Sequence, residues 1–304
     1  MLPGYFRFEK RVWENPWLDM LRALAIALVL ARHGQRAWLD HAPRDAGPID
    51  YLALNGWAGV DLFFVLSGFL IAQSLLAHSN QPTTLRFAEY AAKRALRILP
   101  AYYAVLFLVA SGFFPGFPAN TDHLGLRVVY HMLFLQDYLP SDINVVFWSL
   151  GVEEKFYLVA PAVAAVIAAR KSVAGGVVVL TAIAALSPLL RVITFEASAE
   201  PVSYAAFWQT MRSPFHACLE PLLVGVGVAF LASRNIAIAS GRMAGVLLAA
   251  ALAVAVLLLT SHEMAATIDY VDVLAQPVCI AVLFGLMVFA AHSLKTTALP
   301  LEPV

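Results

Sequence analysis

Asp19, Arg22 and His33 are ionisable side chains in a largely apolar segment near the N-terminus. Each residue of a helix turns by about 100°, so the eleven steps from Arg22 to His33 place both on one face, about 16 Å apart along the axis. Asp19 precedes Arg22 by three residues and can pair with it. An imidazole deep in an apolar helix predicts acid–base chemistry. The structural alternative is a snorkelling arginine and a histidine bonded to another helix.

A second group of ionisable residues lies in the sequence FWSLGVEEKFYLVAP. Glu153 and Tyr157 are one helical turn apart, so we expect Glu153 to reach into a polar cavity. Glu154 and Lys155 are expected to meet water or lipid headgroups. A buried carboxylate beside an imidazole fixes its tautomer and stabilises the imidazolium, so Glu153 is the predicted catalytic partner of His33. The alternative is that Glu153 only anchors its helix. The side chains expected to support the site are Trp148, Ser149 and Tyr157.

Two arginines, Arg94 and Arg97, stand just before a long apolar segment in the sequence KRALRILPAYY. Because they are three residues apart, they project from one helix face. Two guanidinium groups there suit a polyanionic ligand such as a phosphorylated nucleotide. The alternative is that these charges only hold the helix at the cytoplasmic boundary, which needs no special spacing.

The sequence GVDLFFVLSGFLI, residues 59–71, is predicted to have a structural role. Asp61 stands at the expected start of a membrane helix, where a carboxylate can cap free backbone amides. Ser67 and Gly68 are small enough to let helices approach closely.

Arg212, His216 and Glu220 recur every four residues and are therefore expected to line one helical face. That face can bind an acceptor substrate or hold the helices together, and the spacing does not choose between the two.

The elements that position these side chains must be membrane helices. Of the 304 residues 61% are hydrophobic and 13% are charged, far from the balance of a soluble domain. The formal net charge of zero gives no indication of a nucleic-acid partner. Cys218 and Cys279 lie in apolar stretches without metal-ligand spacing, so we expect buried free thiols and no metal site.

Apolar stretches long enough to cross a bilayer recur along the whole chain. Five have no Asp, Glu, Lys or Arg: 62–85, 98–121, 172–190, 243–262 and 273–294. Three less clean candidates are 17–38, 147–169 and 213–233. The predicted fold class is therefore all-α, a polytopic transmembrane helical bundle of eight or nine crossings in a single domain, residues 1–304.

Loop charge predicts the orientation. The basic residues before the first span and between the second and third place these regions in the cytoplasm: Arg7, Lys10, Arg11, Arg86, Lys93, Arg94 and Arg97. The segment 123–139 either crosses or is re-entrant. A re-entrant segment puts a set of later basic residues in the cytoplasm as well, so loop charge favours it. These residues are Arg170, Lys171, Arg234 and Arg242.

Four blocks in this order make the chain resemble the acyltransferase-3 family of integral membrane acyltransferases. They are Arg22 with His33 after ten residues, the span 59–71, Arg94 and Arg97 before Pro100, and Trp148 to Tyr157. The resemblance covers the first half of the chain densely and the second half weakly, through residues 212–229. The family commonly has Asp where Glu220 aligns. Its usual final helix, opened by a Gly-x-Ile-Ser-Tyr-like block, is expected about where this chain stops at Val304.

The resemblance implies transfer of an acyl group, usually acetyl, from acyl-coenzyme A to a hydroxyl of a cell-surface polysaccharide or similar acceptor. Arg94 and Arg97 would hold the phosphates of coenzyme A. His33 would act as general base or as a transient acyl carrier, oriented by Glu153, while Arg22 with Asp19 would hold the first helix in register. A bacterial inner membrane, no permanently bound cofactor and no nucleic-acid partner are implied.

Two other functions compete with the enzyme. A transporter or flippase can use intramembrane charges to bind a proton or an anionic solute, but we find no inverted repeat and no paired broken helices. A non-catalytic remnant is the other, because the chain stops early relative to the family.

Overall fold

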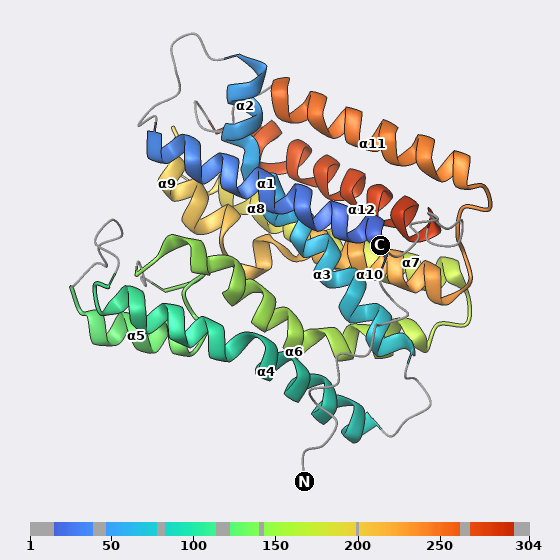
Figure 1. Ribbon diagram of the computed structural model, residues 1–304, viewed down its shortest axis with the longest axis horizontal. Helices are drawn as coiled ribbons and strands as arrows, with labels where there is room; N and C mark the ends of the chain where they lie inside the picture. The colour runs from blue at the N-terminus through green and yellow to red at the C-terminus, as the bar shows by residue number, and fades with distance from the viewer. Residues whose placement is uncertain are drawn as a thin grey trace, which may run out of the picture.

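The computed structural model describes residues 15–38, 47–77, 83–113, 122–139, 143–198, 201–261 and 268–294, and this part of the chain is helical without a β-strand (Figure 1). The predicted all-α fold is confirmed. The α-helices are α1 (Pro16–Trp38), α2 (Pro48–Leu54), α3 (Ala58–Ala77), α4 (Thr83–Ala110), α5 (Leu124–Met132), α6 (Trp148–Ala168), α7 (Val173–Ala184), α8 (Leu186–Glu196), α9 (Tyr204–Phe207), α10 (Leu219–Ser233), α11 (Gly241–Ser261) and α12 (Gln276–Leu294). Short 3-10 or π-helical turns are η1 (Asn55–Trp57), η2 (Val145–Phe147), η3 (Trp208–Arg212), η4 (Phe215–Ala217) and η5 (Val271–Ala275).

Four helical stretches of the described chain are long and apolar enough to cross a membrane: Pro48–Ala77, Val173–Glu196, Gly241–Ser261 and Val271–Leu294. The apolar helix α10 is shorter, with 15 residues. Charged residues interrupt α1, α4 and α6. A bundle with membrane-type helices is therefore confirmed, whereas the count of eight or nine crossings stays a prediction.

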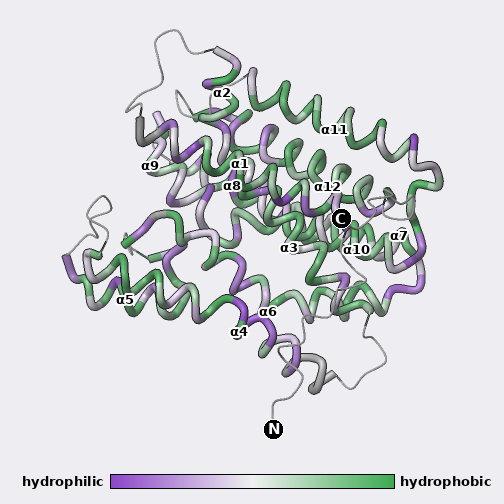
Figure 2. Tube along the Cα trace, in the orientation of Figure 1, coloured by the Kyte–Doolittle hydropathy of each residue, from purple (hydrophilic) through white to green (hydrophobic). Residues whose placement is uncertain are grey.

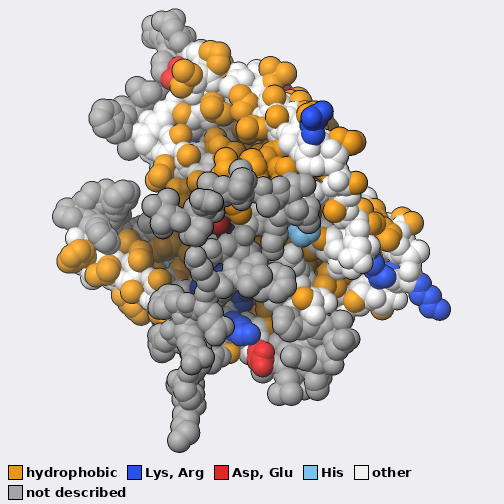
Figure 3. Space-filling view, turned by 45° about the vertical axis from the view of Figure 1, so that its right-hand side comes forward, with side chains coloured by type: hydrophobic (Ala, Val, Ile, Leu, Met, Phe, Trp, Pro, Cys, Tyr) orange, Lys and Arg blue, Asp and Glu red, His pale blue; other side chains and the backbone are white. Residues whose placement is uncertain are grey.

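Apolar side chains also cover the outside of the bundle. In Figure 2 α11 is hydrophobic along nearly its whole length, and its residues Met243, Val246 and Leu257 are 65–66% exposed. Figure 3 shows apolar side chains spread over one face of the molecule with few charged ones among them. Soluble proteins rarely expose continuous apolar patches beyond a few hundred Å². This surface is suited to contact with lipid.

Helix α3 lies in the middle of the bundle and packs on α1, α6, α10 and α12 (Figure 1). Glycines allow it to cross α10 at close range. A β-carbon on Gly68 would lie 2.0 Å from the Leu222 carbonyl oxygen, and one on Gly225 would lie 2.0 Å from the Val65 carbonyl oxygen. The close helix approach predicted at Gly68 is confirmed.

The segment 123–139 holds one short helix, α5. Its nine residues span about 14 Å, less than half of a hydrocarbon layer of about 30 Å. The helix lies along α4 (Figure 1), because the Tyr102 hydroxyl donates to the His131 carbonyl at 2.9 Å and the Tyr103 hydroxyl to the Met132 carbonyl at 3.1 Å. This agrees with the re-entrant version of the segment.

Candidate active site

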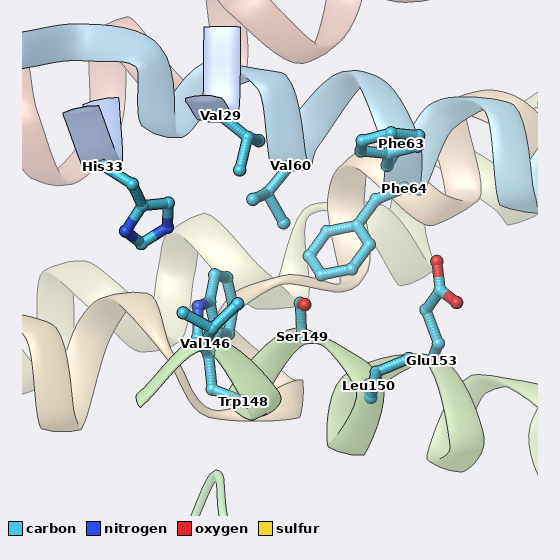
Figure 4. A pocket seen from close by; sticks show the side chains of 10 residues that line it. All are labelled: Val29, His33, Val60, Phe63, Phe64, Val146, Trp148, Ser149, Leu150 and Glu153. Atoms are coloured by element: carbon cyan, nitrogen blue, oxygen red, sulfur yellow. The ribbon is translucent and has the colours of Figure 1, made fainter. Parts of the chain in front are cut away.

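A pocket of about 240 Å³ opens between α1, α3 and the start of α6 (Figure 4). Four of its lining side chains can form hydrogen bonds: His33, Trp148, Ser149 and Glu153. The others are apolar: Val29, Val60, Phe63, Phe64, Val146 and Leu150. Three of the blocks singled out in the sequence therefore meet at one cavity, although they lie up to 120 residues apart.

Helix α1 brings His33 to this pocket. It runs without interruption from Pro16 to Trp38, so Arg22 and His33 share a face as expected. Gly59 of α3 sets the distance between the two helices, because a β-carbon there would lie 2.5 Å from the Ala25 carbonyl oxygen.

The expected pairing of Arg22 with Asp19 is confirmed. Both side chains are about half exposed, and neither lines the pocket. The pair therefore lies away from His33, on an earlier turn of the same helix.

Glu153 lies at the end of the pocket opposite His33. Its two carboxylate oxygens accept hydrogen bonds from the Ser67 hydroxyl at 2.8 Å and from the Tyr157 hydroxyl at 2.9 Å. The expected sharing of a polar face by Glu153 and Tyr157 is confirmed. Ser67 was expected only to permit helix packing, so its bond to Glu153 is a contact that the sequence did not reveal.

Figure 4 shows that other side chains of the pocket separate its two ionisable residues. Val60, Phe64 and Ser149 lie between the imidazole of His33 and the carboxylate of Glu153. The structure thus places both residues in one pocket, with the carboxylate held by Ser67 and Tyr157. The role of Glu153 in orienting His33 stays a prediction.

The two arginines of α4 lie near the Glu153 end of this site. The guanidinium of Arg94 is 5.5 Å from the centre of the Tyr157 ring and 5.9 Å from that of Tyr90, within the range of cation–π attraction. The charges of Arg94 and Arg97 both act on Glu153. Neither arginine lines the pocket, and Arg97 is exposed.

Lys155 was expected to meet water or headgroups, and that expectation is wrong. Its ammonium group bonds to the Asp137 carboxylate at 2.5 Å and to the carbonyl oxygens of Phe134 and Gly151. The chain after α5 folds back onto α6 and brings the buried Asp137 to this position. Sequence spacing could not reveal the contact, because the two residues come from different elements.

Asp61 does not serve as a helix cap. The Arg212 guanidinium donates to both of its carboxylate oxygens, at 2.9 and 3.0 Å, and both residues are buried. The guanidinium also lies over the rings of Trp57, at 4.7 Å, and Trp148, at 5.7 Å. Since Trp148 lines the pocket, this ion pair supports one of its walls.

The prediction that Arg212, His216 and Glu220 line one helical face is wrong. Pro214 has an extended backbone, with ψ of 145°, so the π-helical turn η3 ends before it and α10 begins only at Leu219. The three side chains consequently reach different partners. Their role in binding an acceptor stays a prediction.

Each of the other two residues has its own partner, an exposed one for His216 and a buried one for Glu220. The His216 Nδ1 lies 3.0 Å from the Tyr138 hydroxyl, and Glu220 pairs with the buried Arg191. Arg191 was not singled out in the sequence. Its signal was a charge inside an apolar helix, which must be paired when it is buried.

No metal site is visible in the described part of the chain, where no cluster of three or more His, Cys, Asp or Glu side chains could hold an ion. Both cysteines are free thiols, as expected. Cys218 is buried, but the expected burial is wrong for Cys279, which is exposed.

Comparisons with known proteins identify the family of the chain. A family model described as an acyltransferase domain matches residues 15–300. The peptidoglycan O-acetyltransferase of Listeria monocytogenes is 31% identical over 163 residues, which is 48% of this chain and 24% of the relative. A Staphylococcus aureus protein provisionally named an O-acetyltransferase is 26% identical over 172 residues, 53% of this chain and 26% of the relative. The chain thus spans about a quarter of the length of these curated relatives. No solved structure matches it.

Proposed function

The chain belongs to the acyltransferase-3 family, and on that premise we propose that it transfers an acetyl group from acetyl-coenzyme A to a hydroxyl of a cell-envelope carbohydrate. It is a membrane acyltransferase of groups other than amino-acyl groups. Peptidoglycan is the acceptor that we favour, since it is named for the relative from Listeria monocytogenes. The observation that carries the proposal is the single pocket lined by His33, Ser149 and Glu153, with Arg94 and Arg97 near one end.

The donor would bind at the arginines. Arg94 and Arg97 would hold the phosphates of coenzyme A, because guanidinium groups bind phosphate oxygens in pairs. The thioester arm would then pass Tyr157 and Glu153 toward His33. A pocket of about 240 Å³ is smaller than most ligand pockets, at about 300–1,000 Å³, so it would take only the reacting end of the donor. No permanently bound cofactor is needed in this scheme.

His33 would carry the proton or the acyl group. As a general base it would take the proton of the acceptor hydroxyl while that oxygen attacks the thioester carbon. As a nucleophile it would take the acyl group first and pass it to the acceptor. Glu153 would stabilise the positive charge that develops in the pocket in either route.

The proposed setting is a bacterial inner membrane with the N-terminus in the cytoplasm and eight or nine crossings. This orientation places Arg94 and Arg97 on the side where coenzyme A is found. It also places the acceptor on the opposite side, at the His33 end of the pocket.

The test measures thiol release from acetyl-coenzyme A and acetylation of a peptidoglycan fragment in membranes that contain the chain. We expect His33→Ala to abolish both, because neither route works without the imidazole. The matched control is His123→Asn, which changes an exposed histidine with φ of 54°, a conformation that Asn tolerates. Full activity of His33→Ala would exclude the proposed site. Solute flux without thioester consumption would instead support the transporter.

A further inference from the structure

Helix α6 carries three polar side chains at successive turns on one face: Ser149, Glu153 and Tyr157. Tyr157 lies under Arg94, Glu153 lies at one end of the pocket, and Ser149 lies between Glu153 and His33 (Figure 4). This row of three side chains therefore runs for about 12 Å along α6, from the arginines into the pocket. The reacting end of a donor that follows it would arrive beside Ser149.

The hydroxyl of Ser149 is directed into the pocket (Figure 4). In the described part of the chain no side chain or carbonyl forms a hydrogen bond with it, in contrast to Ser67, which is bound to Glu153. A hydroxyl donor in a largely apolar cavity stabilises negative charge more strongly than the same group in water, since little solvent competes with it. Ser149 is thus placed to bond to a ligand oxygen.

The backbone under Ser149 is held in place by its neighbour Trp148. The Trp148 ring makes edge-to-face contacts with Phe64, at 5.9 Å between centroids, and with Trp208, at 5.3 Å. On a further side it meets the guanidinium of Arg212, which is itself bound to Asp61. A donor on so constrained a turn needs little reorganisation during a reaction.

We propose that Ser149 is a further catalytic residue of this pocket, whose hydroxyl donates a hydrogen bond to the carbonyl oxygen of the acyl group as that oxygen becomes negative. This rests on the proposed function. The acceptor oxygen forms a bond to the thioester carbon, and the carbonyl electron pair moves to the oxygen beside Ser149. When that pair returns, the carbon–sulfur bond breaks, and the thiolate takes the proton that His33 removed from the acceptor.

The pocket favours this role over that of a nucleophile. A serine nucleophile needs a base within hydrogen-bond reach, and in the described part of the chain neither His33 nor Glu153 bonds to the Ser149 hydroxyl. The carboxylate of Glu153 is already bound by Ser67 and Tyr157. A covalent acyl-serine is therefore an outcome that would contradict the proposal.

The experiment compares Ser149→Ala, Ser149→Thr and the control Ser261→Ala in the same acetyl-transfer assay. Ser261 is exposed at the end of α11 and bonds only to its own helix, at Leu258. We expect Ser149→Ala to lower kcat by about 100-fold or more with KM for acetyl-coenzyme A unchanged, as for loss of an oxyanion donor. Ser149→Thr, which keeps the hydroxyl, should recover much of the rate. Thermal unfolding of all three variants in detergent controls for folding.

Running His33→Ala beside these variants distinguishes a failure of the Ser149 role from a failure of the proposed function. If His33→Ala is inactive and Ser149→Ala has the wild-type kcat, the role of Ser149 is overturned and the proposed function stands. If His33→Ala is fully active, the proposed function is overturned, and the role of Ser149 that rests on it is overturned too. A raised KM with unchanged kcat in Ser149→Ala, or an acyl group found on Ser149 by mass spectrometry, would also overturn the oxyanion role.

Discussion

At the scale of single residues, the ion pair of Asp61 and Arg212 carries two full charges into the interior of the bundle. Their side chains are only 3% and 4% exposed. Removing one partner of such a pair leaves the other charge buried and uncompensated, which is strongly unfavourable. The pair of Asp19 and Arg22 is the exposed counterpart within the same chain, with side chains 54% and 40% exposed.

We therefore expect Asp61→Asn to lower the free energy of unfolding by about 3–5 kcal/mol. Asp19→Asn should change it by about 0–1 kcal/mol, because solvent screens an exposed pair. Denaturant midpoints in detergent measure both. In a double-mutant cycle, adding Arg212→Met to Asp61→Asn should restore part of the loss, since no buried charge is then left unpaired. A midpoint of the double variant below that of either single variant would contradict this account.

The sequence separation between two residues decided whether their contact could be predicted. Asp19 with Arg22 and Glu153 with Tyr157 are three and four residues apart, so helical geometry alone indicates them. Asp61 and Arg212 are 151 residues apart. Such a contact depends on how helices pack, and the sequence shows only that each charge needs a partner. The same holds for Lys155 with Asp137 and for Arg191 with Glu220.

At the scale of elements, the crossing of α3 and α10 depends on glycine. At Gly68 any side chain would force the two backbones apart, whereas Gly245 in α11 has open space around it. We expect Gly68→Ala to lower the free energy of unfolding by about 1–3 kcal/mol or more. Gly245→Ala should be neutral or stabilise by up to about 1 kcal/mol, because alanine favours the helix.

Thermal unfolding of the two variants in detergent, each compared with the wild type, measures this difference. Because α3 also carries Val60, Phe63 and Phe64 into the pocket, Gly68→Ala should lower acetyl transfer as well. Equal stability of the two variants would show that the crossing adapts to a β-carbon.

Elements themselves were predictable where the apolar run was long, as in α3, α11 and α12. The prediction failed around residue 214, where the four-residue spacing of charged side chains resembles a helix. Proline has no amide hydrogen, and the residue before it is disfavoured in a helix, so the chain breaks there into η3, η4 and α10. Charged side chains do recur every four residues here, but no continuous helix joins residues 212 and 220.

At the scale of the whole molecule, basic loops gather at one end of the bundle. Figure 1 places the turn between α6 and α7 near the turn between α10 and α11, and the Arg234 guanidinium donates to the Arg170 carbonyl at 2.7 Å. Lys171 and Arg242 belong to the same two turns. The re-entrant version of segment 123–139 predicts this arrangement, since it leaves both turns on the cytoplasmic side.

Helix α11 offers a direct test of this orientation, because its 21 residues span about 30 Å, the thickness of the hydrocarbon layer. Its two ends carry exposed residues, Arg242 and Ser261, that can each be changed to cysteine. In a Cys279→Ala background, which removes the exposed native thiol, a membrane-impermeant maleimide should label Ser261→Cys in intact cells. It should label Arg242→Cys only in inverted vesicles, because the basic end faces the cytoplasm. The buried Cys218 serves as the internal control, since it should react only after denaturation. Labelling of both ends from one side would show that α11 does not cross, and the reverse pattern would contradict the re-entrant version of segment 123–139.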